Sequence, residues 1–162
     1  MTYDIVIVGA GSAGCILAEQ LSENPAVSVV LLEAGPHDWN PLIHLPMGAR
    51  KLFQHNSYQW GDQSEPETAA DARRMAVPHG KVMGGTGSLN FMAYVRGNPA
   101  DFARWETLGA TGWSYEKVLP WFRKLEDWQG GASAWRGAGG PIRVERPAGV
   151  DPIAGGWLNA AR

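Results

Sequence analysis

Apolar and polar positions near the start of the chain predict two strands joined by a helix. A β-branched run at residues 4–8 ends at glycine, which is typical of a buried strand. Apolar residues then recur at every fourth position from Ala13 to Leu21, as on one face of a helix, and residues 27–32 form a second strand run. This order within about thirty residues predicts a parallel βαβ unit at residues 3–35 and an α/β, Rossmann-like fold.

The periodic pattern weakens after this unit. Prolines interrupt it throughout residues 36–79, which predicts a loop excursion with one short helix near Met47–Leu52. A second glycine-rich segment follows at residues 80–97. Asn98-Pro99 is typical of a helix start and opens a helical segment at residues 98–127.

The remaining pattern predicts two helices and the start of a further segment. Phe102 and Trp105 are expected to face inward from the first helix, and a second helix begins at Ser114. Residues 141–162 predict a short strand and then a helix that opens at Asp151-Pro152. One βαβ unit supplies too few strands for a closed core. We therefore expect the N-terminal part of a longer protein, completed by its C-terminal part or by a complementing chain.

Composition and charge exclude several classes of protein. The chain is 44% hydrophobic and 19% charged, and no apolar run approaches the ~20 residues of a membrane-spanning helix. A net charge of −2 gives no support for a nucleic-acid-binding surface. Cys15 is the single cysteine, which excludes an internal disulfide and a multi-cysteine metal site. The start of the chain lacks a signal-peptide pattern, so a cytoplasmic location is expected.

The first glycine cluster has the context of a dinucleotide-binding motif. Gly9-x-Gly11-x-x-Gly14 follows a strand and opens a helix, and Glu33 lies at the end of the next strand. Gly9 permits the tight turn, Gly11 lets the backbone approach a pyrophosphate, and Gly14 lets the helix pack closely on the strand. FAD and NAD share this motif, so the pattern alone does not separate them.

Polar groups around this motif match two parts of such a ligand, the charged pyrophosphate and the neutral ribose. Free amide groups near Ser12 and Ala13, at the start of the helix, favour a pyrophosphate. Glu33 can accept hydrogen bonds from both ribose hydroxyls, and its charge would repel the 2′-phosphate of NADP.

The second glycine cluster, Gly80–Asn90, contains four glycines and two hydroxyl residues within eleven positions. Such a segment can lie flat along a ligand and donate backbone amides where side chains would clash. A flexible surface loop is the alternative, but the segment carries too many apolar residues for that interpretation.

Taken together, these motifs resemble the glucose–methanol–choline (GMC) oxidoreductase family. The resemblance rests on both glycine motifs and on Leu31–Gly35, Tyr94–Gly97 and Gly109–Phe122, in this order. Met83 departs from the family signature, which usually has a branched aliphatic residue or Trp there. The resemblance implies a fold of the glutathione-reductase type that binds FAD. It also implies oxidation of a small-molecule alcohol to an aldehyde or ketone, with hydride transfer to flavin N5.

The resemblance also implies the cofactor-binding residues. The pyrophosphate would lie at Ser12 and Ala13 and the adenosine ribose at Glu33 and Ala34. An aromatic beside the cofactor corresponds to Trp60, and residues of the second motif would line the ribityl and flavin side. The expected set is Gly9, Gly11, Ser12, Ala13, Gly14, Glu33, Ala34, Trp60, Val82, Gly84, Gly85, Thr86, Asn90, Phe91, Met92 and Ala93.

Two further expectations concern chemistry. Leu89 stands where some members carry a histidine tethered to the flavin, so the resemblance implies non-covalent FAD. The family's catalytic histidine lies near the C-terminus, and no matching motif occurs here. His37, His44, His55 and His79 lie in the loop region without partners at catalytic or metal-ligand spacing. We therefore expect neither a catalytic residue nor a metal site in this chain.

Two other functions remain open at this stage. One is a non-oxidative use of FAD within the family, as in hydroxynitrile lyases or the light-driven decarboxylase. The other is a truncated nucleotide-binding module without activity of its own.

Overall fold

The computed structural model describes every residue except 1, 55–57, 148, 150 and 162. The chain divides between Ala93 and Tyr94 into two compact units, each described here by itself.

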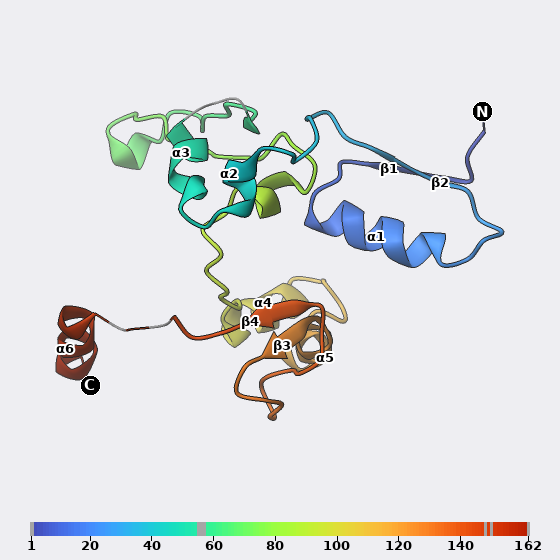
Figure 1. Cartoon of the computed structure of the whole chain (residues 1–162). Coiled ribbons are helices and arrows are strands. Elements are labelled where there is room, and N and C mark those ends of the chain that lie inside the picture. Colours follow the sequence, from blue (N-terminus) through green and yellow to red (C-terminus); the bar gives the residue numbers. More distant parts are fainter. Residues whose placement is uncertain (1, 55–57, 148, 150, 162) are drawn as a thin grey trace. The chain divides into compact units, whose positions relative to one another are not determined.

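The first unit begins with the predicted βαβ arrangement. Strand β1 (Ile5–Val8), helix α1 (Ser12–Ser22) and strand β2 (Val29–Leu32) follow one another along the chain. The two strands are parallel, with Ile5 opposite Val29 and Val8 opposite Leu32, and α1 lies along them (Figure 1). The prediction is confirmed, although the second strand starts two residues later than the apolar run.

A charged contact fixes the start of this strand pair. The Asp4 carboxylate accepts hydrogen bonds from the backbone amide of Ser28 at 2.8 Å and from its hydroxyl at 2.6 Å. The Asp4 amide in turn donates to the carbonyl of Ser28 at 3.1 Å. These hydrogen bonds from Ser28 lower the pKa of Asp4 below its ordinary value. The two strands therefore enter the sheet in a defined register.

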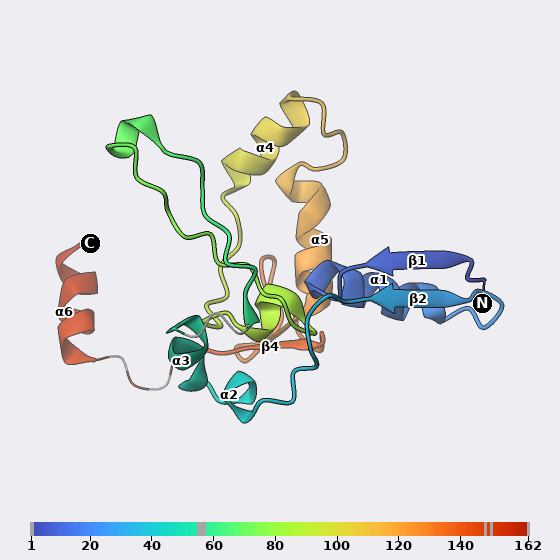
Figure 2. The same cartoon turned by 90° about the horizontal axis from the view of Figure 1, so that it is seen from above.

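The core of the first unit lies among the segments that follow the βαβ arrangement. Helices α2 (Pro41–His44) and α3 (Gly48–Gln54) pack together, and α3 accounts for the short helix predicted here (Figure 2). Leu52, Val82 and Leu89 form a buried cluster. Leu42, Ile43 and Tyr58 surround it. The second glycine segment therefore contributes apolar side chains to the core, which separates it from an ordinary surface loop.

Part of the predicted loop excursion is a two-stranded arm. Three isolated antiparallel bridges join Gln59 to Gly80, Gln63 to Ala76 and Glu67 to Arg73. A short 3-10 helix, Thr68–Ala70, lies near the tip of this arm (Figure 2). The prolines stop regular strands from forming, but the backbone still pairs at intervals.

The described residues of the second unit form three helices and a small sheet. Its elements are α4 (Pro99–Thr107), α5 (Tyr115–Leu125), β3 (Glu126–Trp128), β4 (Ile142–Val144) and α6 (Pro152–Ala160). The Asn98 and Asp151 side chains cap α4 and α6 by accepting from the amides of Ala100 and Ile153, as the Asn-Pro and Asp-Pro pairs predicted. Among the described residues, no helix is long and apolar enough to cross a membrane.

Two features of this unit differ from the sequence prediction. Phe102 is buried as expected, but Trp105 is 47% exposed. Its ring makes T-shaped contacts with Phe102 and Trp113, with centroids 5.2 and 6.1 Å apart. Strand β3 was not predicted, and it pairs in parallel with β4.

A fully buried carboxylate joins the separate parts of the second unit. Glu126, with no exposed surface, receives guanidinium nitrogens of Arg96 and Arg136, each at 2.8 Å. It also accepts the backbone amide of Gly137 at 2.7 Å. Arg96 donates to the carbonyl of Trp135 as well. One carboxylate therefore ties the segment after residue 94 and the β3–β4 loop to the end of α5.

We expect Glu126→Gln to destabilise the second unit by about 3–5 kcal/mol, because it leaves two guanidinium groups without their shared counter-charge. Urea unfolding of the full-length protein measures the change. The matched control is Glu145→Gln, which removes an exposed pair with Arg143 and should change the unfolding free energy by about 0–1 kcal/mol. Equal effects of the two substitutions would contradict the structural role of Glu126.

Candidate cofactor site

The first glycine motif forms a tight turn between β1 and α1. Gly9 has a φ of +97°, a backbone conformation that favours glycine, and its amide donates to the carbonyl of Leu32 at 2.7 Å. Gly14 is buried, and a Cβ there would overlap the carbonyl oxygen of Gly9. The turn therefore brings α1 directly against the end of β1.

The start of α1 presents backbone amides without a capping side chain. Gly11 is the N-cap residue, and no side chain makes a capping hydrogen bond there. Ser12 and Ala13 begin the helix. Uncapped amides and the helix dipole together favour an anion, as the sequence motif predicted for a pyrophosphate.

The second glycine motif lies directly against the first. A Cβ on Gly85 would lie 2.9 Å from the Cα of Gly11, so the two backbones are in contact. The amide of Gly84 donates to the carbonyl of Ala10 at 2.8 Å. Two segments about seventy positions apart in the sequence therefore form one surface.

A second backbone contact supports this arrangement at the end of β2. A Cβ on Gly35 would overlap the backbone of Lys81 and Val82, so only glycine fits there without a shift. The amide of Met83 donates to the carbonyl of Pro36 at 2.9 Å. The Leu31–Gly35 motif therefore also has a packing function, which the sequence analysis did not assign to it.

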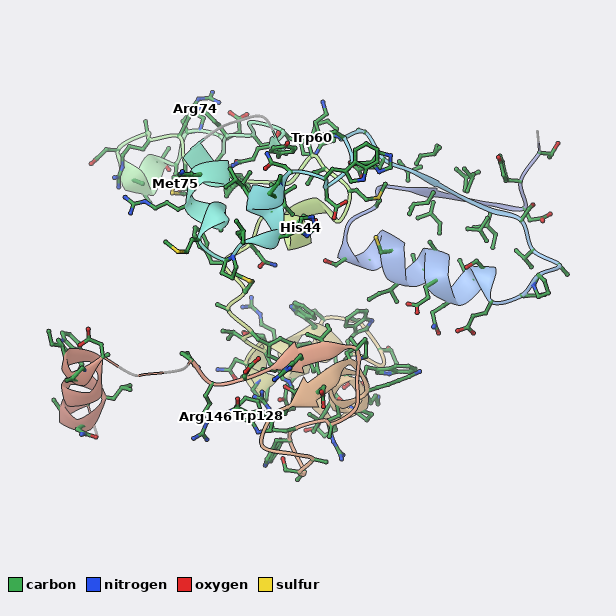
Figure 3. The ribbon with its side chains drawn as sticks, in the orientation of Figure 1. His44, Trp60, Arg74, Met75, Trp128 and Arg146 are labelled. Carbon is green, nitrogen blue, oxygen red and sulfur yellow. The ribbon has the colours of Figure 1, made fainter. Side chains whose placement is uncertain are left out.

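These contacts border an open cavity of about 510 Å³ at the carboxyl ends of β1 and β2. Seven residues of the expected set line it: Gly9, Gly11, Glu33, Ala34, Trp60, Gly85 and Thr86. Trp60, labelled in Figure 3, contributes from the arm that precedes the second glycine motif. Parallel strands leave a crevice of this kind beyond their carboxyl ends, where α/β proteins bind ligands.

Three lining residues were missed by the sequence analysis: Val8, Leu32 and Gly80. Val8 and Leu32 are the last residues of the two parallel strands, so their place at the crevice could have been inferred from the βαβ prediction. Gly80 starts the second motif, and its amide donates to the hydroxyl of Thr86 at 3.0 Å.

The Glu33 carboxylate links the turn to the end of β2. One oxygen accepts the amide of Ala10 and the other accepts the amide of Gly35, each at 2.8 Å. The sequence analysis had assigned this side chain to the ribose alone. A carboxylate has about four acceptor positions, so both amide bonds leave lone pairs for hydroxyl donors.

The other expected residues lie elsewhere. The Val82 side chain is fully buried in the core cluster, and Gly84 has a φ of +89° beside Ser88. Asn90 and Met92 line a separate cavity of about 220 Å³. Phe91 is 62% exposed, and Ala93 ends the first unit.

Two histidines of the loop region make hydrogen bonds to aspartates, and the expectation that neither is catalytic or binds a metal stays a prediction. His79 Nδ1 lies 3.0 Å from Asp62 Oδ2, and His44 Nε2 lies 3.9 Å from Asp38 Oδ2. The folded chain joins each pair across a loop, which spacing alone does not show. His55 lies outside the described residues. Within the part of the chain that the structure describes, no three His, Cys, Asp or Glu residues are grouped as metal ligands.

Comparison with known proteins decides the family. The GMC oxidoreductase model matches residues 3–162. The chain belongs to the GMC oxidoreductase family. It is 44% identical over its whole length to an oxygen-dependent choline dehydrogenase from Rhizobium johnstonii. The corresponding protein from Sinorhizobium medicae is 46% identical. The family resemblance found in the sequence is thereby confirmed.

Solved GMC-like structures show the same fold. Pyridoxine 4-oxidase from Mesorbium loti is 37% identical and superposes with a TM-score of 0.89 over 98% of this chain and 31% of that one. An FAD-dependent oxidoreductase from Chaetomium thermophilum is 32% identical, with a TM-score of 0.81 over 99% and 29%. Formate oxidase from Aspergillus oryzae is 32% identical, with a TM-score of 0.78 over 98% and 29%.

The coverage is similar in each case. The chain spans about 30% of the length of the relatives that it matches. The α/β, FAD-binding fold of the N-terminal GMC region is therefore confirmed, while the remainder of the relatives has no counterpart in these 162 residues.

We expect Glu33→Gln to lower the free energy of unfolding of the apoprotein, in which no ligand is bound. The glutamine amide would direct N–H groups at the amide of Ala10 or of Gly35, so one buried donor loses its acceptor, a loss of about 1–3 kcal/mol. Denaturant unfolding of the apoprotein measures this loss, with Glu19→Gln on the exposed side of α1 as the control. If the two variants unfold alike, the carboxylate does not hold the turn.

Proposed function

We propose that this chain binds FAD and that the protein it belongs to oxidises an alcohol to an aldehyde or ketone. One observation carries the proposal: both glycine motifs and Glu33 meet at a single cavity beyond the carboxyl ends of β1 and β2. Family membership supports the redox chemistry, because relatives include a choline dehydrogenase and a pyridoxine oxidase.

The residues at this cavity fit the adenosine diphosphate half of FAD. The uncapped start of α1 would hold the pyrophosphate. The free lone pairs of Glu33 would accept the ribose hydroxyls, and its negative charge disfavours a 2′-phosphate. Gly11 and Gly85 keep side chains away from the ligand path. We assign the flavin side to residues 90–93, as the family resemblance implies.

This chain and the C-terminal part of the protein would have different roles in the reaction. Bound FAD would supply the hydride acceptor. This chain would orient the cofactor, and a base in the C-terminal part would take the hydroxyl proton of the substrate. The substrate class varies within the relatives, since one of the similar structures is a formate oxidase. The substrate-binding side chains are accordingly also assigned to the C-terminal part.

We expect the full-length protein to be yellow and to release its flavin on acid precipitation. Leu89 is 3% exposed in the aliphatic core cluster, and its side chain offers no nucleophile for a covalent tether. Absorbance of the supernatant near the flavin band measures the release. Flavin that stays with the precipitate would contradict non-covalent binding, and a colourless protein that takes up no FAD would contradict the proposed function.

We expect residues 1–162 alone to leave added FAD oxidised in the presence of primary alcohols under anaerobic conditions. Without a positioned base, proton removal loses about 10²–10⁴-fold in rate. The full-length protein is the positive control, because it should reduce its flavin with at least one alcohol of the panel.

Reduction of the added FAD by residues 1–162 would contradict this prediction. Flavin reduction by the 1–162 chain would place a base within these 162 residues, and His79, which has Asp62 as its partner, would be the first to replace.

A further inference from the structure

Lys81 is placed beside Trp60 by the pairing of two short backbone segments. Gln59 and Gly80 form an antiparallel bridge. On one side of it the Trp60 amide donates to the carbonyl of His79 at 3.1 Å, and on the other the Lys81 amide donates to the carbonyl of Tyr58 at 2.7 Å. Trp60 and Lys81 are diagonal neighbours in this pairing, within reach of each other for long side chains.

The two side chains make a cation–π contact. The Lys81 ammonium lies 4.6 Å from the centroid of the Trp60 ring. A lysine within about 6 Å of an indole face is attracted by the negative face of the ring. Because the ammonium lies over one face of the indole, a flat ligand group would have to stack on the opposite face.

The backbone of Lys81 has little freedom to move. Its carbonyl lies so close to Gly35 that a Cβ on that glycine would overlap it. Gly80, the preceding residue, lines the 510 Å³ cavity and donates to Thr86. Trp60 lines the same cavity although it is 52% exposed. Trp60 is therefore a half-exposed indole in the cavity wall, and its ring is in contact with the Lys81 ammonium.

We propose that Lys81 is a positioning residue for the cofactor. Its ammonium holds the Trp60 ring in the cavity wall, so that the opposite face of the indole stacks on a planar heteroaromatic ring of the ligand. This inference rests on the proposed FAD-binding function and adds a residue outside the expected cofactor-binding set. A direct contact between the ammonium and a phosphate of the ligand is the competing interpretation, which the experiment distinguishes.

The test measures FAD affinity by titration of full-length apoprotein. Lys81→Met keeps the length of the stem and removes the charge, and we expect it to weaken FAD binding roughly three- to tenfold. Lys81→Arg keeps a cation that stacks on indole and should restore most of the affinity. Lys51→Met on the exposed surface of α3 is the matched control and should bind FAD like the wild type.

A double-mutant cycle with Trp60→Leu separates the two interpretations. If Lys81 acts through Trp60, Lys81→Met should have no further effect in the Trp60→Leu background. Loss of affinity by the same factor in both backgrounds would mean that Lys81 contacts the ligand by itself, and it would overturn the proposal. Circular dichroism of each apoprotein checks that the variants are folded.

The FAD titration also distinguishes failure of the proposed function from failure of the role of Lys81. Wild-type apoprotein that does not bind FAD would overturn the proposed function. Wild-type binding with unchanged affinity in Lys81→Met would overturn only the role of Lys81.

Discussion

The first unit depends on the close approach of two backbones, at Gly11 against Gly85 and at Gly35 against Lys81. A side chain at Gly85 or at Gly35 would hold the segments apart, so these two glycines are a packing requirement of the fold. The cavity exists because the segments meet at the carboxyl ends of β1 and β2. Glu33 holds the same junction through two amides, so the side chain that we propose for ribose binding also stabilises the turn.

The second unit is held together by a buried charged side chain. Glu126 has no exposed surface and is paired with two arginines and a backbone amide. An unpaired carboxylate in this position would be strongly destabilising, so the network holds together or fails as a whole. It joins Arg96, the end of α5 and the β3–β4 loop through hydrogen bonds, which are directional where apolar contacts are not.

Large apolar residues remain exposed at the edges of both units. Val8 is 83% exposed at the end of β1, and Ile153 and Trp157 on α6 are each at least 75% exposed. Exposed apolar surface of this kind marks an interaction site. Val8 lines the proposed cofactor cavity. The relatives are about three times as long as this chain, and we propose that the C-terminal part covers Ile153 and Trp157.

The sequence by itself determined the elements with local signals. The β-branched runs, the Asn98-Pro99 and Asp151-Pro152 caps and the first glycine turn all lie where the pattern predicted, because periodicity and capping act within a few residues. The ordered motifs also determined the family.

Tertiary structure alone decided the features that join distant segments. Strand β3 forms only because β4 pairs with it, and Val82 enters the core because α3 packs beside it. The partners of Glu33, His79 and Lys81 likewise depend on how the backbone folds back on itself. Such contacts follow from three-dimensional proximity, which a one-dimensional pattern does not encode.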